Sequence, residues 1–262
     1  MLSLSGLSKS FGGLQVLKNV TFTMPERGIV GLIGPNGAGK TTVFNLITGL
    51  LVPGEGRIEL LGRELNGMAP YQVTRCGVAR TFQNIRIFKE MSVLENVLIA
   101  VRPQHKYSPA HLFRSSRGSQ DSKQREEEFA RELLRRVGLV DSAEDAAGTL
   151  PYGAQRRLEI VRALATSPKL LLLDEPAAGM NPIEKQQLMD EVIKLDQSGL
   201  SILLIEHDMN FVMGICKQII VMNFGQVIAV GSSEEIRQDP RVIEAYLGRD
   251  DESDSTSSER RS

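Results

Sequence analysis

The chain has 262 residues, of which 41% are hydrophobic and 24% are charged, and its formal net charge is −1. This length and composition fit a folded protein with one large or two small domains, and the near-neutral charge gives no electrostatic reason to expect binding to nucleic acid or to an anionic membrane surface. The two cysteines, Cys76 and Cys216, are far apart and lack a metal-binding spacing. We therefore expect buried free thiols rather than a disulfide.

The N-terminus lacks the charged segment and the long apolar run of a signal peptide, so we expect none. No apolar run approaches the ~20 residues that a membrane-spanning helix needs. Residues 1–28 alternate between apolar and polar side chains, which predicts short antiparallel strands. The apolar run Ile29 to Ile33 predicts a buried strand, and the periodic segment Val43 to Leu50 predicts a helix.

Between that strand and that helix lies a full P-loop, Gly34-Pro35-Asn36-Gly37-Ala38-Gly39-Lys40-Thr41. Its glycines allow consecutive backbone N–H groups to turn inward around phosphate oxygens, and the following helix N-terminus adds partial positive charge. We expect Lys40 to reach the β- and γ-phosphates and the Thr41 hydroxyl to hold Mg²⁺. The alternative, a glycine-rich turn that happens to precede a lysine, does not explain the strand–loop–helix context.

Further elements are expected on both sides of a helical region that runs from about Asn84 to Gly148. The expected elements are a strand at Arg57–Leu61, an exposed loop at Pro103–Gln124, a helix at Glu126–Val137 with Phe129, Leu133, Leu134 and Val137 on one face, a strand at Leu170–Leu173, a helix at Glu184–Gln197, a strand at Leu200–Ile205, a hairpin at Ile219–Val230 and a helix at Glu234–Leu247. The last residues, Asp250 to Ser262, contain no apolar side chain, so we expect a disordered and dispensable tail, with a regulatory docking tail as the alternative.

Carboxylates and a histidine follow two of the buried strands. An apolar strand that ends in Asp174-Glu175 places both carboxylates at the carboxyl edge of the sheet, where phosphates bind. Asp174 fits the Mg²⁺-associated acid of P-loop NTPases, and Glu175 can take a proton from water. His207 follows the next buried strand and can hydrogen-bond a γ-phosphate, although a lone histidine is more often a satisfied polar residue. Gln83, before the helical region, can contact Mg²⁺ or water; an exposed glutamine without a role is the alternative.

Together these motifs resemble those of the ATP-binding subunit of an ABC transporter, from residue 1 to about 248. The matches are Gly34 to Thr42 with the Walker A motif, Gln83 with the Q-loop, Leu170 to Asp174 with Walker B, Glu175 with the catalytic glutamate, His207 with the switch histidine and Phe11 with the aromatic residue that stacks on adenine. For Phe11 the alternative is an ordinary residue at a strand end. The resemblance implies ATP and Mg²⁺ as ligands, with Thr41, Gln83 and Asp174 at the metal.

The fold that the resemblance implies is α/β, a P-loop NTPase of the ABC-ATPase type. It has a RecA-like core with an antiparallel β-subdomain, and a helical subdomain is inserted in the core. On this chain the core would comprise residues 1–83 and 152–248, the helical subdomain residues 84–151, and the polar tail residues 249–262.

Two motifs depart from the family pattern. The usual signature Leu-Ser-Gly-Gly-Gln is replaced by Leu150-Pro151-Tyr152-Gly153-Ala154, which lacks the serine hydroxyl and can give a weaker or asymmetric site. Gly153 stands at the start of a predicted helix and can still offer its N–H to the ATP of a partner subunit. Asn181 replaces the usual aspartate of the D-loop and can hydrogen-bond without carrying charge.

Longer segments resemble one group, the LivG/BraF-type ATPases of bacterial high-affinity branched-chain amino-acid importers. The segments are Arg80-Thr81-Phe82-Gln83, Tyr152 to Ile160, Asp174 to Pro182, Glu206-His207-Asp208-Met209 and the ending from Ile236 to Gly248. The resemblance implies a peripheral protein at the cytoplasmic face of the inner membrane, with two permease subunits, a periplasmic binding protein and a second ATPase subunit, either a different chain or, in isolation, a copy of itself. Nucleic acid is not an expected partner.

Three other functions compete with this one. ATPases for urea uptake or lipopolysaccharide export share part of the pattern. A non-transport ABC ATPase usually carries two cassettes or a coiled-coil insert, neither of which is visible in this sequence. A nucleotide sensor without hydrolysis would not need Glu175 and His207. The segment Asn84 to Glu95, with Phe88 among other apolar residues and charges, suits a membrane-protein partner; packing of the helical subdomain is the alternative.

Overall fold

The computed structural model describes residues 1–101 and 117–247. Two sheets form its centre, one with four strands in the order β2-β1-β4-β5 and one with six strands in the order β10-β9-β3-β8-β7-β6. The strands are β1 (Leu2–Phe11), β2 (Leu14–Met24), β3 (Gly28–Ile33), β4 (Glu55–Leu60), β5 (Arg63–Glu64), β6 (Val78–Arg80), β7 (Leu170–Asp174), β8 (Ser201–Ile205), β9 (Gln218–Asn223) and β10 (Gln226–Gly231).

The smaller sheet is antiparallel, whereas β6, β7, β8, β3 and β9 of the larger sheet are parallel neighbours. Strand β10 pairs antiparallel with β9 as the second arm of a hairpin. The mixed α/β fold with a P-loop is the fold class that the sequence predicted, and the strands expected at Ile29–Ile33, Leu170–Leu173 and Leu200–Ile205 are confirmed.

The parallel strands are buried on both faces, as continuous apolar runs require. In β7, Leu170 and Leu172 enter one apolar cluster with helix α1 (Lys40–Ile47) and the four-stranded sheet. Leu171 and Leu173 enter a second cluster on the opposite face, with helices α5 (Tyr152–Leu164), α6 (Pro182–Gln197) and α7 (Met209–Ile215). Since successive side chains of a strand point to opposite faces, one strand joins both cores.

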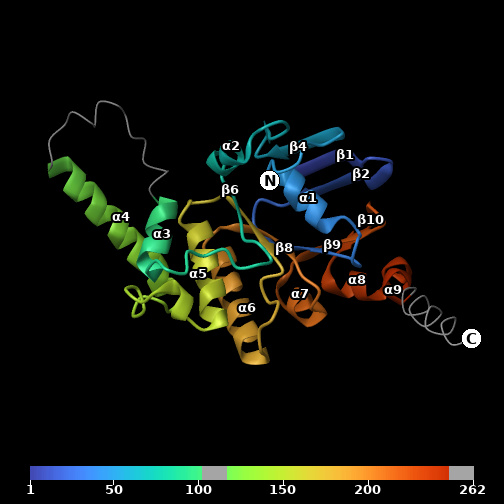
Figure 1. The fold of residues 1–262 in the computed structure, drawn as a ribbon. Helices are drawn as coiled ribbons and strands as arrows, with labels where there is room; N and C mark the ends of the chain where they lie inside the picture. Colours follow the sequence, from blue (N-terminus) through green and yellow to red (C-terminus); the bar gives the residue numbers. More distant parts are fainter. Residues whose placement is uncertain (102–116, 248–262) are drawn as a thin grey trace, which may run out of the picture.

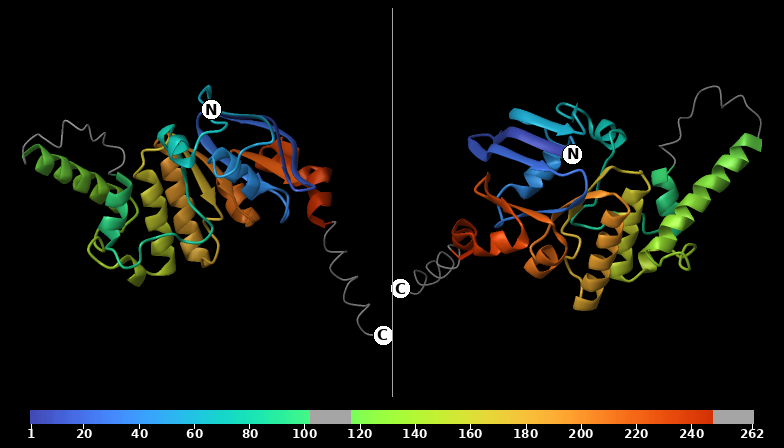
Figure 2. Two further views of the ribbon diagram at one scale, coloured as in Figure 1. Left: turned by 45° about the horizontal axis from the view of Figure 1, so that its top comes forward. Right: turned by 180° about the vertical axis from the view of Figure 1, so that it is seen from behind.

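The helices surround these sheets in Figures 1 and 2. They are α1 (Lys40–Ile47), α2 (Pro70–Arg75), α3 (Val93–Val101), α4 (Arg117–Arg136), α5 (Tyr152–Leu164), α6 (Pro182–Gln197), α7 (Met209–Ile215), α8 (Ser233–Gln238) and α9 (Pro240–Leu247), with a 3₁₀ turn at Ala147–Thr149. Helices α3 and α4 lie at one end of the molecule, and α8 and α9 lie at the other (Figure 1). Among the residues that the structure describes, no helix is both long and apolar enough to cross a membrane.

A third apolar cluster lies apart from the sheets and joins α3, α4 and α5. Its fully buried members include Val97, Leu134 and Leu158, one from each helix. Ala130 is also fully buried. Phe129, which the sequence placed on one face with Leu133, Leu134 and Val137, has a side chain that is 38% exposed, unlike those three. Residues 130, 134 and 137 fall at helical spacings of four and three, and position 129 lies about 100° away from that stripe.

Several predicted boundaries are also wrong. The first helix begins at Lys40 and ends at Ile47 rather than covering Val43 to Leu50, because Gly39 and Gly49 adopt positive φ angles at its two ends. Helix α4 already begins at Arg117, inside the loop expected at Pro103–Gln124, whose residues before 117 lie outside the described part. Its first turns are charged and lack the apolar period that signals a helix.

Two other segments differ from the expected helices. Helix formation after Gln83 begins only at Val93, so the stretch from Asn84 onward is extended or turned rather than helical. The C-terminal helix expected over Glu234–Leu247 is two helices that meet at Asp239 and Pro240. Proline disfavours the α conformation of the residue before it, which separates the two helices.

Cys76 and Cys216 are free, and only Cys216 is buried. The expected tail lies outside the described residues.

Candidate active site

One edge of the six-stranded sheet carries four of the expected site segments. The P-loop follows β3, His207 follows β8, Glu175 follows β7 and Gln83 lies just beyond β6. These four strands are consecutive neighbours in the sheet, in the order β3-β8-β7-β6, and all run parallel. Their carboxyl ends therefore open at one edge, which is where open α/β sheets bind ligands.

The P-loop is packed closely against the strand beside it. Gly34 has φ +145°, and a Cβ atom there would lie 2.0 Å from the carbonyl oxygen of Met222 at the end of β9. Only glycine fits this backbone conformation and this approach. The Lys40 ammonium is buried and donates hydrogen bonds to the carbonyl oxygens of Gly34 at 2.6 Å and Pro35 at 3.0 Å.

A hollow opens beside the P-loop and combines it with residues from the ends of β7 and β8. Its lining comprises Val16, Asn36, Gly37, Gly39, Lys40, Thr41, Thr42, Glu175 and His207. Backbone N–H groups at a helix N-terminus, together with a lysine, form a binding place for anions such as phosphate. The structure thus brings a carboxylate and an imidazole to the rim of an anion site.

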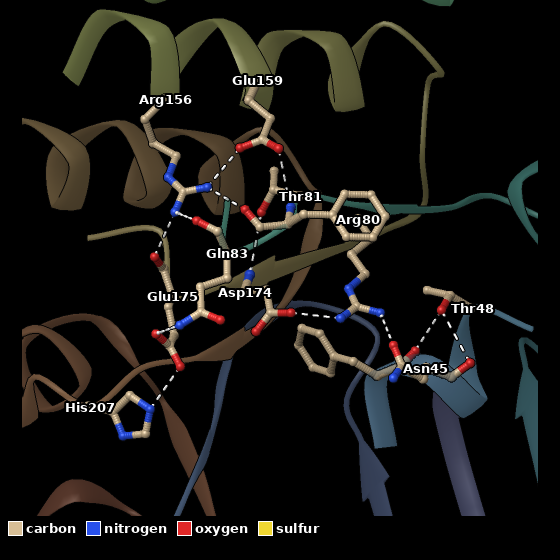
Figure 3. A network of polar contacts seen from close by, with 12 residues as sticks. Asn45, Thr48, Arg80, Thr81, Gln83, Arg156, Glu159, Asp174, Glu175 and His207 are labelled. Atoms are coloured by element: carbon tan, nitrogen blue, oxygen red, sulfur yellow. Dashed lines mark hydrogen bonds and ion pairs between the residues drawn. The ribbon is translucent and has the colours of Figure 1, made fainter. Parts of the chain in front are cut away.

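Glu175 is the centre of this arrangement (Figure 3). Its Oε1 lies 2.8 Å from His207 Nε2, and its Oε2 accepts a hydrogen bond of 2.7 Å from the amide Nε2 of Gln83. The Glu175 backbone has φ +47°, an uncommon conformation for a residue with a side chain, and such strained residues cluster at functional sites. Three residues that the sequence singled out as site candidates therefore share direct contacts.

Glu206, which the sequence analysis did not assign a role, holds the turn that carries His207. Its Oε1 accepts the N–H of Ala177 at 2.7 Å, and its Oε2 accepts the N–H of His207 at 3.0 Å. Burial raises the pKa of Glu206 above its ordinary value, although these backbone hydrogen bonds oppose the shift. Asp208 caps α7, and the hydrogen bond from Lys185 lowers the pKa of its carboxyl group.

Asp174 forms a buried ion pair with Arg80, a second residue that the sequence did not single out. Arg80 Nη2 lies 2.7 Å from Asp174 Oδ2, and Arg80 Nη1 donates to Asn45 Oδ1 on α1 at 2.7 Å (Figure 3). The guanidinium carbon also lies 5.4 Å from the ring centre of Phe44 and 5.1 Å from that of Phe82. A buried arginine needs such partners, and this one fixes the acid relative to the P-loop helix.

The donor set at this edge is compatible with Mg²⁺. Thr41 supplies a hydroxyl at the start of α1, and Asp174 supplies a carboxylate at the end of β7, whose Oδ1 lies outside the pair with Arg80. Within residues 1–101 and 117–247 no group of three or more His, Cys, Asp or Glu residues could hold a metal by itself. Mg²⁺ typically uses one or two protein oxygens together with substrate phosphates and water, which matches this sparse set.

Phe11 and Gly153 are not among the residues that line the hollow. Phe11 ends β1 with its side chain 45% exposed, and the Lys9 ammonium lies 5.3 Å from its ring centre. Gly153 is buried in the first turn of α5, where a Cβ atom would lie 2.7 Å from Glu184 Oε1. Both residues therefore contribute to the site only if a ligand or a partner extends to them.

The departures from the family signature have structural counterparts in this chain. Pro151 immediately precedes α5, where a missing N–H breaks no helical hydrogen bond. The Tyr152 hydroxyl donates to the carbonyl oxygen of Ala178 at 3.0 Å. Asn181 accepts the N–H groups of Ile183 and Glu184 and so caps α6. An uncharged amide oxygen is sufficient for this cap.

Comparison with known proteins places the chain in a family. A model of the ABC transporter family matches residues 17–178, and a model described as branched-chain amino acid ATP-binding cassette transporter matches residues 226–252. This chain belongs to the ABC transporter ATP-binding family. The chain is therefore an ABC ATPase, which binds and hydrolyses ATP.

Individual relatives of this ABC ATPase align with nearly the whole chain. BraF of Pseudomonas aeruginosa, a high-affinity branched-chain amino acid transport ATP-binding protein, is 46% identical over 253 residues, 95% of this chain and 98% of the relative. LivG of Salmonella typhimurium, described in the same words, is 47% identical over 252 residues, with 95% and 98% coverage. The crystal structure of an ATP-binding cassette of an ABC transporter in its ADP conformation superposes with a TM-score of 0.82 at 33% identity, covering 95% of this chain and 99% of that one.

Proposed function

We propose that this ABC ATPase powers the import of leucine, isoleucine and valine across the bacterial inner membrane. The observation that carries the chemistry is the contact of Glu175 with both His207 and Gln83 beside the P-loop hollow. The substrate class is supported by the 46–47% identity to BraF and LivG over 95% of the chain and by the C-terminal family model at residues 226–252.

Each residue of the cluster has a proposed part in hydrolysis. Glu175 accepts the proton of the attacking water, while His207 and Gln83 hold that carboxylate and the water in line. Lys40 and the P-loop N–H groups stabilise the charge on the transferring phosphoryl group. Thr41, Asp174 and Gln83 would hold Mg²⁺, which neutralises charge on the β- and γ-phosphate oxygens when it is bound. Phe11 would stack on the adenine.

The proposed assembly completes the site from a second subunit. ATP would lie between the P-loop of one ATPase subunit and the Gly153 segment of its partner, a different chain or a second copy. Two permeases and a periplasmic binding protein would complete the importer, with the ATPase at the cytoplasmic face of the membrane. The relatives' identity as transport ATP-binding proteins supports this arrangement.

The Phe88 segment is the proposed contact with a permease. The Phe88 side chain is 47% exposed, and the Arg162 guanidinium lies 4.9 Å from its ring centre. Arg162 also donates a hydrogen bond to the carbonyl oxygen of Arg86, so the guanidinium that contacts the exposed Phe88 ring is itself held in place. A large apolar side chain held at the surface suits a protein partner. Replacing Phe88 with Asp should lower transport while ATP binding by the isolated subunit persists; normal transport in reconstituted vesicles would contradict this contact.

The decisive experiment for the substrate is uptake. Deleting the gene in its host should abolish high-affinity uptake of labelled leucine, isoleucine and valine. Complementation with the wild-type chain should restore uptake, and complementation with Glu175→Gln should not. Unchanged leucine uptake together with lost urea uptake or lipid export would instead assign the ATPase to another transporter.

A further inference from the structure

Arg156 is the largest fully buried side chain of the described residues, with 0% exposure. It lies on α5, and its two terminal nitrogens reach four acceptors. Nη1 donates to the Phe82 carbonyl oxygen at 2.6 Å and to Glu159 Oε2 at 2.7 Å. Nη2 donates to the carbonyl oxygens of Gln83 and Glu175, each at 2.9 Å. The four N–H groups of the two terminal nitrogens thus match four oxygens (Figure 3), while the fifth N–H group, on the buried Nε, has no hydrogen-bond partner within the described part of the chain.

Glu159 extends this contact along the same backbone segment. Besides balancing the charge of Arg156, its Oε1 accepts the N–H groups of Phe82 and Arg86, each at 3.3 Å. The Arg156–Glu159 pair, one turn apart on α5, is therefore hydrogen-bonded to both the carbonyl and the N–H groups of the segment from Phe82 to Arg86. Losing any of these hydrogen bonds would be costly, because it would leave a desolvated polar group beside a buried charge.

The residues that Arg156 holds are those that face the reacting phosphate in the proposed mechanism. Glu175 carries the carboxylate that contacts Gln83 and His207, and its backbone has the uncommon φ of +47°. A conformation of this type persists only when its surroundings hold it. The hydrogen bond from Arg156 to the Glu175 carbonyl oxygen is such a constraint, and it comes from a different helix.

Arg156 also lies three residues after Gly153 on the same helix. Gly153 is the segment proposed to meet the ATP held by the partner subunit, whereas Glu175 serves the ATP held by its own chain. One turn of α5 therefore separates Gly153, which would contact the partner's ATP, from Arg156, which supports the proposed base Glu175 beside the chain's own ATP. Because α5 is a continuous helix in closely packed surroundings, a shift of its first turn is transmitted to Arg156.

We propose that Arg156 is a positioning residue that couples the start of α5 to Glu175 and Gln83 within one chain. Its guanidinium fixes the backbone from which the Glu175 and Gln83 side chains extend. When the partner's nucleotide contacts the Gly153 segment, this link aligns Glu175 and Gln83 at the chain's own site. This inference rests on the proposed roles of Glu175 and Gly153. Arg156 itself is not among the residues that line the hollow beside the P-loop.

The test compares Arg156→Lys with Arg157→Lys in the full chain. Arg157 is the adjacent arginine on α5, but it faces α6, with Gln187 at 3.4 Å and Glu191 at 3.9 Å. Lysine keeps the charge but offers three donors from one atom, so it cannot reproduce the four-acceptor fork of Arg156. The measurements are kcat and KM for ATP, ATP affinity by calorimetry, and hydrogen exchange of peptides that contain Gln83 and Glu175.

Arg156→Lys should lower kcat by about tenfold or more while ATP affinity changes less than about threefold, since a small displacement of reacting groups reduces turnover without removing phosphate contacts. Exchange near Gln83 and Glu175 should become faster. Arg157→Lys should leave kcat and that exchange near the wild-type values. A kcat for Arg156→Lys within twofold of wild type, or an equal loss in Arg157→Lys, would overturn the proposal.

Glu159→Gln provides a second variant if Arg156→Lys does not fold. It keeps the shape of the side chain but weakens the grip on the Phe82 and Arg86 N–H groups, so exchange there should rise and kcat should fall. Unchanged exchange and unchanged kcat would overturn the proposal. Hydrogen exchange without nucleotide does not depend on hydrolysis, so it tests the Arg156 contact even if Glu175 is not the base or the transported solute is not an amino acid.

Discussion

At the residue scale, the proposed mechanism assigns proton transfer to Glu175 and phosphate binding to Lys40. Glu175→Gln preserves the size and the hydrogen-bonding capacity of the side chain that contacts Gln83 and His207 but removes the basic carboxylate. Turnover should therefore fall by about 10²–10⁴-fold, the usual contribution of a general base, while ATP affinity persists. Both quantities are to be measured on the assembled complex. Wild-type turnover by Glu175→Gln would show that another group is the base.

Lys40→Ala is the contrasting change, since Lys40 lines the hollow with the P-loop amides. Removing its charge should weaken ATP binding itself, with a lower kcat/KM as the consequence. The comparison of the two variants separates binding from chemistry. Equal ATP affinity in Lys40→Ala and wild type would contradict the assignment of Lys40 to the phosphates.

Glu191 makes stability depend on pH. Burial raises the pKa of this carboxyl on α6 to about 7, against an ordinary value of 4.5, although Arg157 opposes the shift. The folded chain therefore holds the proton more tightly than the unfolded chain, and stability falls as pH rises from about 4.5 to about 7. Glu191→Gln, which is neutral throughout, should be more stable than wild type at pH 8, by on the order of 1 kcal/mol. Urea unfolding at pH 5 and pH 8 measures this; a difference that does not grow with pH would refute it.

At the element scale, the P-loop depends on the hairpin strand beside it. A Cβ atom at Gly34 would lie 2.0 Å from the Met222 carbonyl oxygen, and the φ of +145° disfavours any other residue. Gly34→Ala should therefore destabilise the fold by about 3 kcal/mol or more and displace the loop from phosphate. Gly62→Ala is the matched control, because its φ is +75° but nothing lies within 4 Å of its Cβ position. It should lose only about 1 kcal/mol. Equal losses in urea unfolding would contradict the steric explanation.

Helix α5 shows how one element serves two cores. Its residues Leu158 and Val161 are buried with α3 and α4, whereas Ile160 and Ala163 are buried with β7, α6 and α7. The helix therefore joins the helical cluster to the sheet, and Arg156 on it reaches the Gln83 segment. A division of the chain at residue 152 cuts through this shared packing. We propose that α5 is the boundary element between the core, residues 1–83 and 152–248, and the helical subdomain, residues 84–151.

At the scale of the whole molecule, this division predicts separable stability. Leu134 is fully buried in the cluster of α3, α4 and α5, away from the P-loop. Leu134→Ala should destabilise that cluster by about 3 kcal/mol and speed hydrogen exchange in α3 and α4, while ATP affinity stays within about threefold of wild type. Val52→Ala, at a side chain 61% exposed, should change stability by less than about 0.5 kcal/mol. A loss of ATP affinity in Leu134→Ala would show that the two regions do not separate.

The sequence by itself determined the strands of the sheet core and the candidate site residues at their ends. The apolar runs of β3, β7 and β8 identify buried strands. Asp174 ends β7, Glu175 follows it, and His207 lies two residues after β8. Because neighbouring parallel strands end at one edge, strand order alone brings these side chains near the P-loop. The boundaries of α1 and α4 were less predictable, since a lysine at the start of one helix and charged turns at the start of the other hide the apolar period.

Only the tertiary structure decided which side chains hold that chemistry in place. Arg80, Arg156 and Glu206 look in the sequence like ordinary charged residues, yet each is buried and paired with groups far along the chain. Arg80 meets Asp174 across 94 residues, and Phe82 receives Arg156 across 74. The spacing of these residues along the chain does not predict that they form pairs. The pairs form because a charge buried in a packed core is destabilising unless it is paired and hydrogen-bonded. Only the fold determines which partner groups lie close enough.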